Sequence, residues 1–170
     1  MVWRSYWQFR MLTMRAKATV LWAALVVLSC RADDQAEAFF SGDASSRIDR
    51  LDRLPMDQQW KIFKYGNQVR HPPATVLASP IAKRGKVAVY YILDDLNGSE
   101  SDLDYRDALV IFQTVQWGGY YNVCGDGTAL ERIQRNETRI ADKSWKTVYA
   151  QMFNELCRPR GAARVEKGGS

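Results

Sequence analysis

The chain has 170 residues and a formal charge of +5 at neutral pH, but the surplus lies at its two ends. The first 30 residues hold four basic side chains and no acid, whereas residues 31–157 carry 16 basic and 18 acidic side chains. Because a near-neutral body lacks the basic face that neutralises phosphates, the composition argues against nucleic-acid binding.

The first predicted element is an export leader. Basic side chains come before an apolar run over residues 18–30, and no acid appears before Asp33. A membrane potential that is negative inside keeps such a basic end in the cytoplasm while the apolar segment inserts. The run of 13 residues is shorter than the about 20 that cross a hydrocarbon core. The sequence therefore predicts a signal peptide over residues 1–29. The compact length counted from Met14 favours a start at Met14, with Met11 as the alternative.

The leader closes as Val27-Leu28-Ser29-Cys30, and a polar stretch follows at once. This ending resembles the lipobox of bacterial lipoproteins, in which an aliphatic and a small residue precede a cysteine that is acylated, with palmitate for example, and becomes the N-terminus. The resemblance implies lipidation of Cys30 and attachment to a membrane of the cell envelope. In a cell with two membranes, the expected site of attachment is the periplasmic side of the outer membrane. The resemblance covers the leader alone.

Two alternatives to lipidation stay open. An ordinary secretory leader could be cut later, at Ala36-Glu37-Ala38, which fits the small-x-small rule. The apolar run could also stay uncut as an anchor.

The leader is followed by a predicted flexible tether over residues 30–46, because this stretch is polar, rich in small residues and without a period. Residues 158–170, rich in Gly, Arg and Lys, predict a disordered basic tail. The folded domain is expected over residues 47–157.

The domain is predicted to be all-α, because its apolar residues recur at i, i+3, i+4 and i+7. Six helices are expected: one after Pro55, one over about residues 74–84, one carrying Val89 to Leu96, one from Ser101 to Trp117, one carrying Leu130 to Ile140, and a last one, capped by Ser144, carrying Trp145 to Leu156. Three helix pairs are typical of stacked hairpins of the HEAT or tetratricopeptide class, and an irregular bundle is the alternative. Buried strands over Lys86–Leu93 and Leu109–Val115 are a rival interpretation.

Cys124 and Cys157 are the two cysteines that follow Cys30. In an oxidising compartment two such cysteines are expected to form a disulfide. Two buried free thiols are the alternative.

Glycines flank two tyrosines in the segment over residues 118–127. Tyrosine offers a large contact area with little side-chain entropy, which is typical of binding surfaces. The loop therefore predicts a candidate binding surface of Tyr120, Tyr121, Asn122 and Asp126, the alternative being that the tyrosines close the core. The other aromatic residues of the domain lie on or near helical stripes and are expected in the core: Trp60, Tyr90, Tyr91 and Trp145.

No catalytic residue, metal ligand or cofactor is predicted. His71 is the only histidine and lies in a proline-bound turn, and no family signature surrounds either cysteine. A group of carboxylates near the middle of the chain could offer oxygens to calcium, but it lacks the glycine turn and closing glutamate of an EF-hand. Helix capping and solvation are expected for this acidic group: Asp94, Asp95, Glu100, Asp102, Asp104 and Asp107.

The sequence therefore favours a non-enzymatic envelope lipoprotein whose helical domain binds a partner protein. In its size and its lack of an active site it is similar to the immunity proteins that bacteria export to block toxins. The alternative is an envelope hydrolase that uses carboxylates or a bound metal.

Overall fold

The computed structural model describes residues 34–158, which divide into one unit before Asp43 and a second from Asp43 onward. In the first unit, residues 34–41 form a helix in which the rings of Phe39 and Phe40 meet edge to face, with centroids 5.4 Å apart. This segment contains Gln, Glu and two Ala, which favour helix. Part of the predicted tether is therefore helical. The predicted signal peptide, with Cys30, lies outside the described residues.

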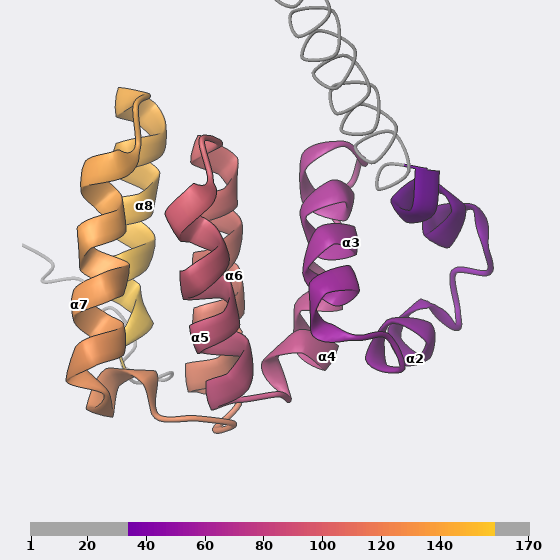
Figure 1. The fold of residues 1–170 in the computed structure, drawn as a ribbon, viewed down its shortest axis with the longest axis horizontal. Helices are drawn as coiled ribbons and strands as arrows, with labels where there is room; N and C mark the ends of the chain where they lie inside the picture. The colour runs from indigo at the N-terminus through magenta and orange to yellow at the C-terminus, as the bar shows by residue number, and fades with distance from the viewer. Residues whose placement is uncertain (1–33, 159–170) are drawn as a thin grey trace, which may run out of the picture. The chain divides into compact units, whose positions relative to one another are not determined.

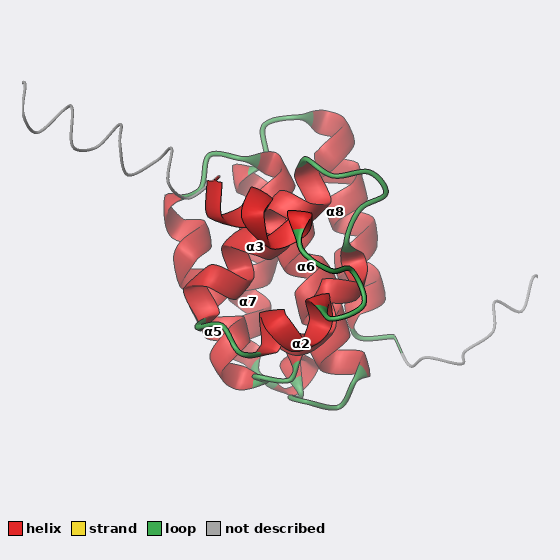
Figure 2. Ribbon diagram, turned by 90° about the vertical axis from the view of Figure 1, so that its right-hand side faces the viewer, coloured by secondary structure: helices red, strands yellow, loops and turns green. Residues whose placement is uncertain are grey.

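Every regular element among the described residues is helical (Figure 2), which confirms the all-α prediction. The second unit contains α2 (Arg47–Asp52), α3 (Met56–Gln68), α4 (Ala78–Ala82), α5 (Lys86–Asp95), α6 (Asp102–Trp117), α7 (Gly127–Asn136) and α8 (Lys143–Leu156). The six predicted helices correspond to α3 to α8, and the two segments of the rival strand interpretation lie in α5 and α6. None of the described helices has the length and apolar character needed to cross a membrane.

The last six helices form three hairpins, α3 with α4, α5 with α6, and α7 with α8 (Figure 1). The first helices of the hairpins make one layer and the second helices make another. In the first layer α5 contacts both α3 and α7, and in the second α6 contacts both α4 and α8. Each helix thus packs on its equivalent in the next hairpin, which is the predicted stacked arrangement.

Apolar side chains at helical spacing form the core. Val89 and Ile92 of α5 and Ile111 and Phe112 of α6 are completely buried, and each such side chain contributes about 1.5–3 kcal/mol by leaving water. Trp60 is buried as expected. The prediction of a core position is wrong for the other three aromatic residues, which are half-buried: Tyr90, Tyr91 and Trp145.

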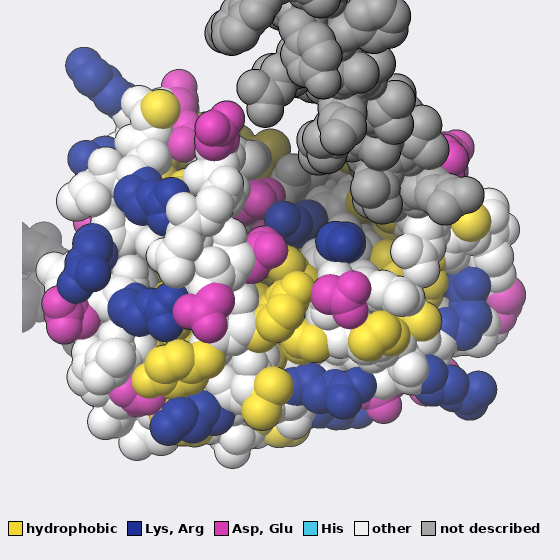
Figure 3. All heavy atoms as spheres, in the orientation of Figure 1, with side chains coloured by type: hydrophobic (Ala, Val, Ile, Leu, Met, Phe, Trp, Pro, Cys, Tyr) yellow, Lys and Arg dark blue, Asp and Glu magenta, His cyan; other side chains and the backbone are white. Residues whose placement is uncertain are grey.

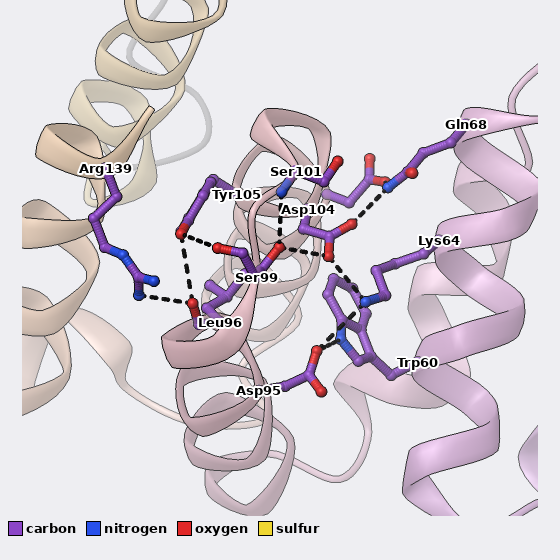
Figure 4. Close-up of polar contacts among 11 residues, drawn as sticks. Trp60, Lys64, Gln68, Asp95, Leu96, Ser99, Ser101, Asp104, Tyr105 and Arg139 are labelled. Atoms are coloured by element: carbon purple, nitrogen blue, oxygen red, sulfur yellow. Dashed lines mark hydrogen bonds and ion pairs between the residues drawn. The ribbon is translucent and has the colours of Figure 1, made fainter. Parts of the chain in front are cut away.

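The first hairpin is joined to the second by side chains of α3 (Figure 4). The indole Nε1 of Trp60 donates to Asp95 at 2.8 Å. The ammonium of Lys64 lies 3.4 Å from the carboxylate of Asp95 and 3.0 Å from that of Asp104. The amide of Gln68 donates to Asp104 at 2.9 Å. Three side chains of α3 therefore hold the turn between α5 and α6 in place.

The second hairpin is joined to the third from the other side of the same turn. Arg139 Nη1 donates to the carbonyl oxygen of Leu96 at 2.7 Å (Figure 4). The carboxylate of Asp102 accepts the backbone N–H groups of Ala141 and Asp142, at 3.0 and 2.8 Å. The α5–α6 turn thus contacts both neighbouring hairpins.

The acidic group predicted from the sequence mainly joins helices to one another. Beyond the contacts above, Asp94 pairs with Arg132 of α7 at 2.7 Å, and Asp107 accepts from Gln68 at 2.9 Å. Glu100 is exposed. Within residues 34–158 no three His, Cys, Asp or Glu side chains meet as metal ligands would. The expectation of capping and solvation missed this role because the partners lie 31–40 positions away in the sequence.

Helix α8 begins differently from the prediction. Its N-cap is Asp142, whose carboxylate accepts the N–H groups of Ser144 at 2.8 Å and Trp145 at 3.0 Å. Ser144 therefore lies inside the first turn and is not the cap. Helix α2, which the sequence did not predict, is a single short element whose Leu51 is completely buried; six residues are too few to show a helical period.

We expect Asp104→Ala to lower the free energy of unfolding by about 2–4 kcal/mol, because Lys64 and Gln68 lose a buried acceptor. Urea denaturation followed by circular dichroism measures the loss. Glu100→Ala is the matched control, since Glu100 is exposed in the same turn, and it should leave the midpoint unchanged. Equal effects of the two variants would contradict the assigned role of Asp104.

Candidate functional site

A polar pocket of about 470 Å³ opens between the start of α5 and the loop that leads into α7. We call it the tyrosine pocket. It is lined by Lys86, Tyr90, Tyr121, Asn122, Gly125, Asp126, Gly127 and Thr128. Because these residues come from α5, from the 118–127 loop and from α7, the pocket depends on how the second and third hairpins stack.

Asp126 joins the elements that line the pocket. The hydroxyl of Tyr90 donates to its Oδ2 at 2.8 Å, and the hydroxyl of Tyr121 donates to the same oxygen. Its Oδ1 accepts the N–H of Ala129 at 3.1 Å, which makes Asp126 the N-cap of α7. One carboxylate thus fixes both tyrosines and begins a helix.

These hydrogen bonds shift the ionisation of all three side chains. The pKa of Asp126 is lowered to about 2, and the hydrogen bond from the hydroxyl of Tyr121 is the largest cause, followed by the one from Tyr90. The same contact raises the pKa of Tyr121 to about 12, and the bond to Asp126 raises the pKa of Tyr90 as well. At neutral pH the pocket therefore holds an ionised carboxylate and two neutral phenols.

Lys86 supplies the positive charge of the pocket. Its Nζ lies 5.4 Å from the centroid of the Tyr90 ring and 5.7 Å from that of Tyr121. Lys86 is also the first residue of α5, where a cation opposes the helix dipole. Contact with the two ring faces, worth about 0.5–1 kcal/mol at exposed sites, offsets that cost.

Two glycines let the loop approach its neighbours. Gly85 has a φ of +57°, and a Cβ added there would lie 2.8 Å from the carbonyl oxygen of Tyr120. A Cβ on Gly125 would lie 2.4 Å from Nδ2 of Asn122, whose Oδ1 accepts the N–H of Gly125 at 2.9 Å. A larger residue at Gly85 would push the loop away from its present place, whereas one at Gly125 would displace the side chain of Asn122.

The predicted disulfide between Cys124 and Cys157 is confirmed; the two residues are 33 positions apart in the sequence and their Cα atoms are 5.7 Å apart. It ties the 118–127 loop to the end of α8. Closing a loop of this length contributes about 3–4 kcal/mol in the chain-entropy account. The bond also indicates that the domain occupies an oxidising, extracytoplasmic compartment.

The predicted binding-surface residues are partly brought together. Tyr121, Asn122 and Asp126 line the tyrosine pocket. Tyr120 does not; it is 43% exposed, and its ring lies beside Gly118. His71 is in an exposed turn.

The sequence interpretation missed Lys86 and Tyr90. The available signal was their i, i+4 spacing, which places both side chains on one face of α5. The helical stripe predicts a core position for Tyr90, whereas the structure places it at the pocket.

Exposed apolar side chains lie close to the pocket in sequence. Val87, next to Lys86, is 67% exposed, and Tyr120 precedes Tyr121. Figure 3 shows the face formed by α3, α5 and α7, where apolar side chains reach the surface between charged ones at the lower left, the region in which α5 and α7 adjoin. The tyrosine pocket is therefore part of a mixed apolar and polar surface.

No protein-family model matches the chain, and the searches of curated proteins and solved structures gave no match either.

We expect Tyr121→Phe to raise the pKa of Asp126 from about 2 toward its ordinary value, because the largest cause of the lowered pKa is removed. Carboxyl carbon chemical shifts followed against pH by NMR measure it. Asp142, whose pKa is lowered mainly by Ser144, is the internal control and should titrate as before. An unchanged pKa of Asp126 would contradict the assigned hydrogen bond.

The same contact makes stability depend on pH at both extremes. Because the folded pKa of Asp126 is lowered, its contribution is present above about pH 4 and is lost as the pH falls toward 2. Because the folded pKa of Tyr121 is raised, its contribution is present below about pH 10 and is lost as the pH rises through 12.

Proposed function

We propose that this chain is a non-enzymatic lipoprotein of the cell envelope whose helical domain binds a partner protein through the surface around the tyrosine pocket. The observation that carries the proposal is the fixed pair of tyrosines, whose hydroxyls both donate to Asp126. Side chains already held in place lose little conformational entropy when a partner binds, which favours affinity.

The surroundings of the pocket support protein binding. The disulfide fastens the loop that carries Tyr121, and the exposed Val87 and Tyr120 offer apolar contact next to polar groups. Protein interfaces combine aromatic anchors with a polar rim in this way. Small-molecule sites, by contrast, are mostly apolar and enclose most of the ligand, whereas this pocket is lined largely by polar side chains.

Membrane attachment through Cys30 is the second part of the proposal. It rests on the lipobox-like ending of the leader and on the oxidising compartment that the disulfide indicates. A diacylated cysteine would hold the domain firmly at a membrane surface. Blocking an incoming toxin, as immunity proteins do, is one form that partner binding could take.

The hydrolase alternative receives no support from the acidic group. Asp95 and Asp104 are engaged by Trp60, Lys64 and Gln68, so their carboxylates hold helices together. We therefore do not propose it.

Photo-crosslinking tests partner binding. The full chain is expressed with benzoylphenylalanine in place of Tyr120, an exposed aromatic residue beside the pocket, and cells are irradiated. We expect one discrete crosslinked species of a single partner. Lys61, exposed on α3, is the matched control position and should give none. Identical products from both positions, or no product from position 120, would count against the proposal.

Cys30→Ala tests the anchor. We expect the variant to carry no acyl chains and to keep its leader uncut, because the lipobox-like ending then lacks the cysteine that the resemblance implies is acylated. Fractionation followed by intact mass measurement gives both readouts, with Ser29→Ala as the control that keeps a small residue before the cysteine. A Cys30→Ala chain that stays on membranes with its leader processed as before would exclude the lipid anchor.

A further inference from the structure

The hydrogen-bonding groups of the tyrosine pocket are unevenly used. The carboxylate and amide acceptors are engaged: Asp126 receives three hydrogen bonds, and Oδ1 of Asn122 receives one. The donors are not. Nζ of Lys86, Nδ2 of Asn122 and the hydroxyl of Thr128 have no acceptor within residues 34–158. The pocket therefore offers hydrogen-bond donors, which suit a ligand that carries hydrogen-bond acceptors.

A cationic ligand does not fit this arrangement. Its natural place would be over the faces of Tyr90 and Tyr121, but the ammonium of Lys86 already lies 5.4 and 5.7 Å from those ring centroids. A second cation there would be repelled by Lys86. The carboxylate of Asp126, which could attract a cation, is taken up by its three donors.

We propose that the tyrosine pocket binds a carboxylate of the partner protein, with Lys86 as its counter-charge and with Asn122 and Thr128 as hydrogen-bond donors. The inference rests on the proposed function, since it names the chemical group by which the partner is recognised. Lys86 also balances the charge of Asp126, so an entering carboxylate meets no net repulsion. Charge-assisted hydrogen bonds are about twice as strong as neutral ones, which favours a carboxylate over an amide.

The position of Lys86 agrees with a binding role. At the first residue of α5 a lysine does not stabilise the helix dipole, and its side chain is exposed. Lys86→Gln should therefore fold as the wild type does, with an unchanged thermal midpoint. Any change in ligand binding can then be assigned to the ammonium group.

NMR titration of the full chain in detergent micelles tests the inference. The probes are acetyl-Gly-Glu-Gly-amide, acetyl-Gly-Gly-Gly with a free C-terminus, and acetyl-Gly-Gln-Gly-amide, which carries no carboxylate. We expect the side-chain amide signals of Asn122 to shift with at least one carboxylate probe and not with the glutamine probe. Which of the two binds tells a side-chain carboxylate from a C-terminal one.

Lys86→Gln should weaken that binding by at least about tenfold, and Lys61→Gln, which removes an exposed lysine of α3, should leave it unchanged. Equal shifts with the glutamine probe, or full binding by Lys86→Gln, would overturn the inference. Crosslinking from position 120 separates the two proposals. If the partner still crosslinks in Lys86→Gln and no carboxylate probe binds, partner binding stands and the carboxylate inference fails. If carboxylate binding depends on Lys86 but nothing crosslinks, the preference of the pocket for carboxylates stands and the proposal of partner binding fails.

Discussion

The stack of hairpins depends on the carboxylates of the α5–α6 turn. The α5–α6 hairpin is the middle one, and its turn reaches both neighbours: Asp95 and Asp104 accept from α3, while Asp102 accepts the backbone N–H groups just before α8. Apolar contact between helix layers is non-directional and allows helices to slide. Hydrogen bonds with fixed geometry do not. One short turn therefore adds directional contacts to both neighbouring hairpins, and these contacts help to fix how the three hairpins stack.

The tyrosine pocket is a consequence of this frame at the opposite end of α5. Asp95, near the end of α5, is bonded to Trp60, whereas Lys86 and Tyr90 lie in its first turns. Because α5 is fixed against α3, those two residues meet the 118–127 loop at a defined distance. The disulfide holds the same loop from the side of α8. The pocket thus combines side chains from two hairpins without belonging to either, and Asp126 closes the arrangement by bonding to both tyrosines.

Features that depend on near neighbours in the sequence could be predicted. Helical periods located α3 to α8, two remaining cysteines indicated their own disulfide, and glycines around Tyr121 marked the loop. Contacts between hairpins could not. The carboxylate of Asp104 looks like a helix-capping or solvated group until Lys64, 40 positions away, is seen beside it. Tyr90 was missed for a related reason: an aromatic residue on a helical stripe has the same pattern whether it faces a core or a half-open pocket.

Asp104 and Asp126 show how a structural carboxylate differs from one at a binding surface. Each carboxylate accepts three hydrogen bonds, so the two do not differ in charge or in the number of hydrogen bonds that they accept. The difference lies in the residues around them. The donors beside Asp104 bond to Asp104 or to carboxylates near it, so their hydrogen bonds are satisfied within the domain. Around Asp126 the ammonium of Lys86 and the amide of Asn122 keep donors with no acceptor in the described chain. Hydrogen-bonding capacity that folding leaves unused, at a surface that folding has made rigid, is available for a partner.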